Sequence, residues 1–142
     1  SQVIDVFAGT GALGLEAISR GAAFASFIEN DAAALAVLRA NIAKLRFQSS
    51  AAVLAADATN LVHWRAAPGN LVFADAPYQT GSGLLAINAL AKIGALGDAA
   101  VIIVETAKTE IMDSDDLAAG LTPIDQRNYG KALLNFLTYQ TP

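Results

Sequence analysis

The sequence predicts an α/β fold built on a doubly wound, mostly parallel sheet with an antiparallel hairpin at its C-terminal end. Three features support this prediction. Short apolar strands alternate with helical segments, a glycine-rich turn follows the first strand, and two strand-like runs close the chain. The 142 residues are 54% apolar, which is enough to bury the core of one domain. We therefore expect a single domain over residues 1–142.

The first half of the chain contains three predicted strands. Val3 to Phe7 is a β-branched and apolar run, and the helix-forming segment Leu13 to Arg20 follows it closely. Asn30 and Asp31 can cap the next helix, in which apolar residues recur at helical spacing. The other elements expected in this half are strands at 24–29 and 51–56 and a short helix at 60–65.

The second half alternates in the same way. The segment 70–74 is apolar on both faces, so we expect a strand that is buried on both sides, as parallel strands are. The elements expected after it are a helix at 84–93 and strands at 100–105, 123–129 and 132–139. Only Gly130 and Lys131 separate the last two strands, which indicates a hairpin and therefore an antiparallel pair at one edge of the sheet.

Three glycines, Gly9, Gly11 and Gly14, lie between the first strand and the first helix. Glycine adopts the unusual φ values of a tight turn, and its missing Cβ lets a ligand approach the backbone closely. The helix that follows presents free N–H groups and the positive end of its dipole. A strand, a glycine turn and a helix in this order predict a binding site for a nucleotide-like cofactor.

Two cofactors fit this turn. The spacing GTGALG matches the dinucleotide fingerprint, and Glu29 lies about twenty residues further on, which keeps an NAD-binding oxidoreductase open as an alternative. However, Asp5 lies inside the first strand, and a second motif, DAPY, occupies Asp75 to Tyr78 at the end of another strand. These two features favour S-adenosyl-L-methionine (SAM) as the cofactor.

Acidic residues follow three predicted parallel strands. Glu29, Asp57 and Asp75 each come at the carboxyl end of a strand, where a doubly wound sheet binds its ligand. A carboxylate has two oxygens to offer the two hydroxyls of a ribose, which is the role we expect for Glu29. We expect Asp57 to accept a hydrogen bond from the adenine amino group.

The DAPY motif suits transfer of a methyl group to an exocyclic amine. Asp75 and the main-chain carbonyl of Ala76 offer two acceptors for the amine hydrogens, and Tyr78 offers a flat face for an extruded base. Methyl transfer is an in-line displacement, so most of its rate comes from alignment of the two reactants.

Four segments of the chain together resemble the RsmD-type methyltransferases. The segments are VIDVFAGTGALGLEAISRGA, FIEND, FADAPY and NYGKALLNFLTY. The resemblance implies a Rossmann-like class I methyltransferase fold, SAM as cofactor, and methylation of the N2 amine of a guanine. It also implies 16S rRNA or an assembling small ribosomal subunit as the partner.

The resemblance also assigns residues, motif by motif. It implies cofactor binding by eight residues: Asp5, Ala8, Gly9, Gly11, Glu29, Asn30, Asp57 and Ala58. It implies a catalytic tetrad of Asp75, Ala76, Pro77 and Tyr78. The family has proline at the second position of the tetrad, and Ala76 supplies the same carbonyl there. The family also has a hairpin and helix upstream of the first strand, and we expect this segment to be missing here.

Composition limits the partners. The net charge is −4, so RNA contact has to come from local cations, for which Arg127, Asn128 and Lys131 near the last hairpin are candidates. The chain has no cysteine and no apolar run long enough for a membrane helix, and we expect a cytoplasmic monomer that needs no membrane and no metal ion. The alternatives left open are methylation of DNA adenine or of a protein glutamine, and a non-catalytic domain that binds SAM or RNA.

Overall fold

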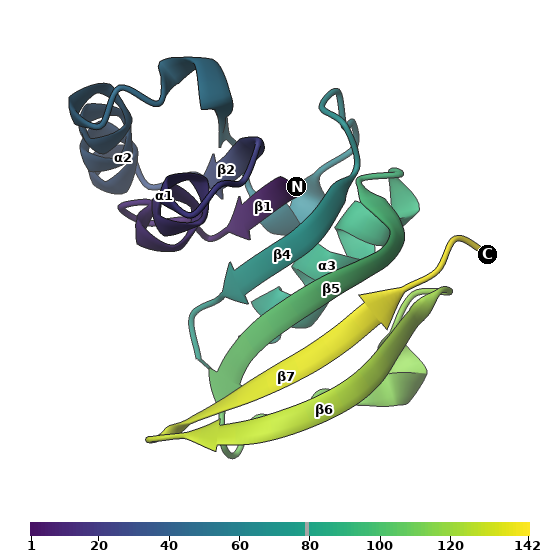
Figure 1. Cartoon of the computed structure of the whole chain (residues 1–142). Coiled ribbons are helices and arrows are strands. Elements are labelled where there is room, and N and C mark those ends of the chain that lie inside the picture. The colour runs from purple at the N-terminus through teal and green to yellow at the C-terminus, as the bar shows by residue number, and fades with distance from the viewer. Residues whose placement is uncertain (79) are drawn as a thin grey trace.

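The computed structural model describes residues 1–78 and 80–142, in which seven strands form one sheet in the order β3-β2-β1-β4-β5-β7-β6 (Figure 1). The strands are β1 (Gln2–Val6), β2 (Phe24–Glu29), β3 (Ala51–Ala55), β4 (Gly69–Asp75), β5 (Leu96–Ala107), β6 (Leu121–Tyr129) and β7 (Ala132–Tyr139). The helices are α1 (Ala12–Ser19), α2 (Ala32–Lys44) and α3 (Ser82–Lys92), with three short 3-10 helices, η1 (Gln48–Ser50), η2 (Ala58–Asn60) and η3 (Ser114–Asp116).

The sheet reverses its direction of growth at β1. From β1 the chain proceeds outward through β2 to β3, and it then returns to place β4 on the other side of β1. Strands β1 to β5 are parallel, whereas β7 pairs antiparallel with both β5 and β6. The predicted doubly wound sheet with a closing hairpin is therefore confirmed. The carboxyl ends of β1 and β4 form its topological switch point.

Two apolar clusters hold the helices to the sheet. On one face, α1 and α2 pack over β1 and β2, with Phe27 and Leu38 fully buried between them. On the other face, α3 packs behind β4 and β5 through Ile87 and Leu90 (Figure 1). Each large apolar side chain removed from water contributes roughly 1.5–3 kcal/mol to stability, so these contacts fix the positions of the strand ends.

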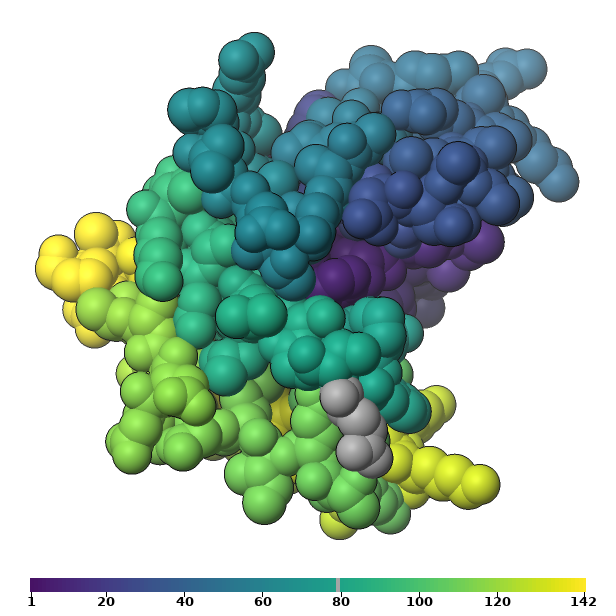
Figure 2. Space-filling model, turned by 180° about the vertical axis from the view of Figure 1, so that it is seen from behind, coloured from purple at the N-terminus to yellow at the C-terminus, as the bar shows by residue number. Residues whose placement is uncertain are grey.

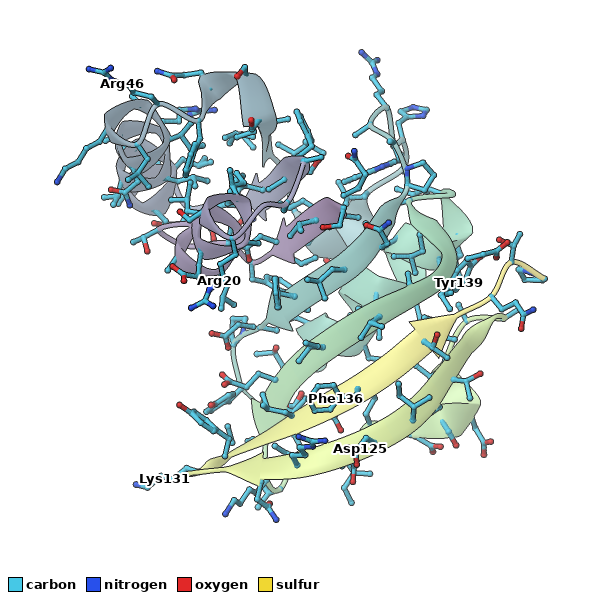
Figure 3. All side chains as sticks on the ribbon, in the orientation of Figure 1. Arg20, Arg46, Asp125, Lys131, Phe136 and Tyr139 are labelled. Carbon is cyan, nitrogen blue, oxygen red and sulfur yellow. The ribbon has the colours of Figure 1, made fainter. Side chains whose placement is uncertain are left out.

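The face of β4, β5 and β7 beside α1 is only partly covered. On β4, Val72 and Ala74 are buried against the α3 side, but Leu71 and Phe73 on the opposite side are half-buried. The prediction that 70–74 is buried on both faces is therefore wrong, because α1 and α2 lie over β1 to β3 and cover Leu71 and Phe73 of β4 only in part. Phe136 of β7 lies on the same partly covered face (Figure 3).

The predicted helix at 60–65 is also wrong, because the described chain has only the 3-10 turn η2 at 58–60 and no helix over 61–68. The carboxylate of Asp57 caps the start of η2. Its Oδ1 accepts from the backbone N–H of Thr59 at 2.9 Å and from the Thr59 hydroxyl at 2.7 Å. Its Oδ2 accepts from the side-chain amide of Asn60 at 3.0 Å. The helical conformation ends at Leu61, whose backbone is extended, with φ −65° and ψ 134°.

Strand β6 forms one edge of the sheet. In the described residues it pairs only with β7, and every residue after Leu121 is exposed. A register shift interrupts the ladder between Pro123 and Asp125. The Arg127 side chain contacts the Asp125 carboxylate at 3.0 Å and lies over the Phe136 ring at 5.5 Å from its centroid.

None of the helices in the described part of the chain has the length and apolar character needed to span a bilayer.

Candidate active site

The turn between β1 and α1 has an unusual backbone. Phe7, Gly9 and Gly11 have φ values of +57°, +58° and +84°, and the N–H of Gly11 closes the turn on the carbonyl of Ala8 at 2.8 Å. A Cβ on Gly9 would meet no atom within 4 Å, so the space in front of it is open to a ligand. A Cβ on Gly11 or Gly14 would instead collide with the α2 and β2 side chains beneath the turn. Gly9 therefore faces open space. The missing Cβ atoms of Gly11 and Gly14 instead let the turn pack closely against α2 and β2.

Asp5 lies beneath this turn rather than in the open space. Its side chain is almost fully buried, and its Oδ2 accepts from the backbone N–H of Gly14 at 2.9 Å. Burial raises the pKa of Asp5 to about 7, the hydrogen bond from Gly14 opposes this rise, and the negative charges of Asp75 and Glu29 add to it. The contact of Asp5 with the start of α1 indicates that it positions the turn.

Glu29 ties the end of β2 to the glycine turn. Its Oε1 accepts from the backbone N–H of Gly9 at 2.8 Å. Its Oε2 accepts from the N–H groups of Asn30 and Asp31 at 3.0 and 2.9 Å. Oε1 keeps one further lone pair, so the group can still accept from one donor of a ligand while it holds the turn.

The turn after β3 is built in a similar way. The side-chain hydrogen bond from Thr59 is the main reason why the pKa of Asp57 lies below its usual value, so Asp57 is ionised at neutral pH. Ala58, the first residue of η2, is buried.

A cleft of about 610 Å³ joins the ends of β2, β3 and β4. Seen from the opposite side (Figure 2), it lies between the blue part of the chain around α2 and the teal part that follows β4, with purple atoms of the first residues at its bottom. Its lining residues are Phe7, Glu29, Asn30, Asp31, Asp57, Thr59, Asp75, Ala76, Pro77 and Ser82. The structure thus brings the three predicted strand-end acids to one cleft.

Not every predicted site residue lines this cleft. Asp5 and Ala58 are buried next to it, Ala8, Gly9 and Gly11 belong to the turn, and Tyr78 lies outside it. Conversely, sequence reasoning assigned no ligand role to Phe7, Asp31, Thr59 or Ser82, all of which line the cleft. The sequence signal for them was only their position directly after a strand or before a helix.

The tetrad begins at the last residue of β4 and contacts β5. The Tyr78 hydroxyl donates to Oε2 of Glu105, at 3.3 Å, and the Tyr78 ring is about half exposed. Partial burial, then the hydrogen bond with Glu105, and then the charge of Glu105 raise the pKa of Asp75 to about 6. The pKa of Tyr78 is also raised, first by desolvation and then by the Glu105 charge. Glu105 is therefore part of this site, although the sequence indicated only that it ends a strand.

The fold and the site together define the class of protein, which is the Rossmann-like class I methyltransferases. The defining features are the sheet order that reverses at β1, the glycine turn at the switch point and the acidic motif at the end of β4. Two solved structures share this fold. A methylase of Haemophilus influenzae superposes with a TM-score of 0.85 at 26% identity, over 99% of this chain and 87% of that one. A methyltransferase of Escherichia coli gives a TM-score of 0.85 at 32% identity, over 100% of this chain and 78% of that one.

Sequence comparison gives the family. The family model described as "Conserved hypothetical protein 95" matches residues 1–138. Ribosomal RNA small subunit methyltransferase D of Escherichia coli strain K12 is 42% identical over 106 residues, which are 75% of this chain and 53% of that protein. The chain belongs to the RsmD-type methyltransferase family. It spans about half the length of the curated relatives that it matches.

Metal ligands do not gather in the part of the chain that the structure describes, where no group of three or more His, Asp or Glu side chains could hold an ion.

Proposed function

We propose that this chain is a single methyltransferase domain that transfers a methyl group from SAM to the N2 amine of a guanine in 16S rRNA. The observation that carries the proposal is the cleft in which Glu29, beside the glycine turn, and Asp75, at the start of the tetrad, line one continuous space. The name of the Escherichia coli relative supports small-subunit rRNA as the substrate.

The residues at the cleft fit SAM. Its volume of about 610 Å³ lies within the range of about 300–1,000 Å³ that is common for small-molecule sites. Through the free lone pair of Oε1, Glu29 would accept from a ribose hydroxyl, and the Asp57–Ala58 segment would lie beside the adenine. The open space in front of Gly9 would admit the methionine part. When bound, SAM supplies an electrophilic methyl group on a sulfonium centre.

The residues of the tetrad would orient the acceptor. In its ionised form, Asp75 accepts a hydrogen bond from the guanine amine, and the carbonyl of Ala76 accepts a second one. These two contacts fix the direction of the nitrogen lone pair, and Asp75 can then take the proton that the nitrogen loses. The Tyr78 ring, about half exposed, would stack on the extruded base.

The test is methyl transfer from labelled SAM to four substrates: small ribosomal subunits that lack the modification, naked 16S rRNA, DNA, and a protein with an exposed glutamine. We expect label in rRNA only, released as N2-methylguanine after digestion. Label in DNA adenine or in glutamine would contradict the substrate, and tighter binding of NAD than of SAM would contradict the cofactor.

Replacement of Gly9 tests the placement of the cofactor. We expect Gly9→Val to lower SAM affinity by at least about tenfold, because the side chain would occupy the open space in front of the turn. Calorimetric titration with SAM measures the effect. Gly94→Val is the matched control, since Gly94 also has a positive φ, of +76°, and open space around its missing Cβ, but lies beyond the far end of α3.

Both variants should lose a similar amount of stability, about 1–2 kcal/mol, because valine is strained in this backbone conformation. Equal SAM affinity in the two variants would contradict the assignment of the turn to the cofactor.

A further inference from the structure

A second hollow adjoins the cleft on the other side of Asp75. It has a volume of about 250 Å³ and lies between α1 and the partly covered sheet face. Its walls are the apolar side chains of Leu13, Phe73, Ile103 and Leu134, and its acidic residues are Asp75 and Glu105. Asp75 lines both spaces. A base held in this hollow can therefore lie next to a methyl donor that is bound in the cleft. The hollow is smaller than most drug-sized sites, which suits a single flat base.

The two acids are neighbours because of the strand register. Asp75 and Glu105 are directly paired in the parallel ladder of β4 and β5, so both side chains leave the same face of the sheet at the same level. Their carboxyl groups are within hydrogen-bonding reach of one another, and the Tyr78 hydroxyl donates to Oε2 of Glu105.

Two adjacent carboxylates in a partly apolar site repel one another unless N–H or O–H donors face them. A ligand edge with two adjacent N–H donors therefore suits this pair. Among the four RNA bases, only guanine has such an edge, with N1–H beside the N2 amine. Adenine and cytosine have a ring acceptor next to their amine, and uracil has one N–H between two carbonyls.

We propose that Glu105 accepts the N1–H of the target guanine while Asp75 holds its N2 amine, so that Glu105 selects guanine over purines that lack N1–H. This inference rests on the proposed function and adds a specificity residue to it. A purine without N1–H would point a ring lone pair at the Glu105 carboxylate, and a site built for a donor rejects a ligand without one.

The experiment compares guanine with 2-aminopurine, which keeps the 2-amino group but has an acceptor at N1. The methylated guanine is first mapped with the wild-type protein, and 16S rRNA is then ligated with either base at that position. We expect the wild-type protein to prefer guanine by about 30- to 100-fold in kcat/KM. In Glu105→Gln the side-chain amide can donate to N1, and we expect this preference to fall at least tenfold.

Two variants and a second readout make this result specific. Glu16→Gln, on the exposed surface of α1, should keep the wild-type preference. Glu105→Ser should reduce the preference in the same way as Glu105→Gln, which covers the case in which the glutamine variant fails to fold. The fluorescence of 2-aminopurine in the ligated RNA, titrated without SAM, should report tighter binding to Glu105→Gln than to the wild-type protein.

A merely structural role for Glu105, through its contacts with Asp75 and Tyr78, would lower the rates on both bases equally. An unchanged preference in both Glu105 variants, with guanine still methylated by the wild-type protein, would therefore overturn this inference alone. If the wild-type protein methylated no guanine, both the proposed function and this inference would be refuted.

Discussion

Asp75→Ala is expected to lose about a hundredfold in kcat while its affinity for SAM stays within twofold of the wild-type value. The carboxylate is assigned to the acceptor amine, and loss of one aligned acceptor costs on the order of 3 kcal/mol of transition-state stabilisation. Single-turnover methyl transfer to small ribosomal subunits measures the rate, and titration calorimetry measures SAM binding.

Asp98→Ala is a suitable control for this experiment. Asp98 lies near the amino end of β5, at the opposite end of the parallel strands from Asp75, and accepts the backbone N–H of Thr141. Its removal should leave kcat unchanged. Normal turnover in Asp75→Ala would refute the role given to the tetrad.

Asp5→Asn is expected to stabilise the protein at alkaline pH. The pKa of Asp5 rises from 3.8 in the unfolded chain to about 7 in the folded protein, so the unfolded state loses this proton first. Stability contributed by the protonated group is therefore complete below about pH 4 and declines as the pH rises toward 7. Asparagine keeps an oxygen for the N–H of Gly14 and has no charge to bury.

The gain from Asp5→Asn should be near zero at pH 4 and on the order of 2–4 kcal/mol at pH 8, measured by urea unfolding across this range. The exposed helix cap Asp31 provides the control. Its side chain accepts from the N–H of Ala34, and asparagine caps equally well, so Asp31→Asn should change stability by less than about 0.5 kcal/mol. A constant difference between wild type and Asp5→Asn over the whole range would contradict the buried charge.

Local signals in the sequence were sufficient for most of the architecture. The alternation of apolar runs and helices predicted the succession of the main strands along the chain. Two of these strands, β2 and β7, have the predicted bounds. The glycine turn and the strand-end acids were equally visible, because the carboxyl ends of parallel strands always meet at one edge. Glu29, Asp57 and Asp75 could therefore be grouped before any coordinates were known.

Features that depend on contacts between distant segments were missed. The pairing of Asp75 with Glu105 follows from the register of β4 and β5, which no local pattern specifies. The partial exposure of Phe73 depends on how far α1 and α2 extend across the sheet. The buried contact between Asp5 and Gly14 likewise requires the turn to fold back over β1. In each case the sequence showed the residue but not its neighbour.

The exposed margin of the hairpin has a consequence for self-association. An unprotected outer strand invites hydrogen bonding by a second chain, which begins aggregation. Here Pro123 offers no N–H, the irregularity after it distorts the ladder, and the Asp125–Arg127 pair puts opposite charges on that margin. These devices disfavour strand addition along β6, so the protein can keep a long, solvent-facing border without polymerising through it.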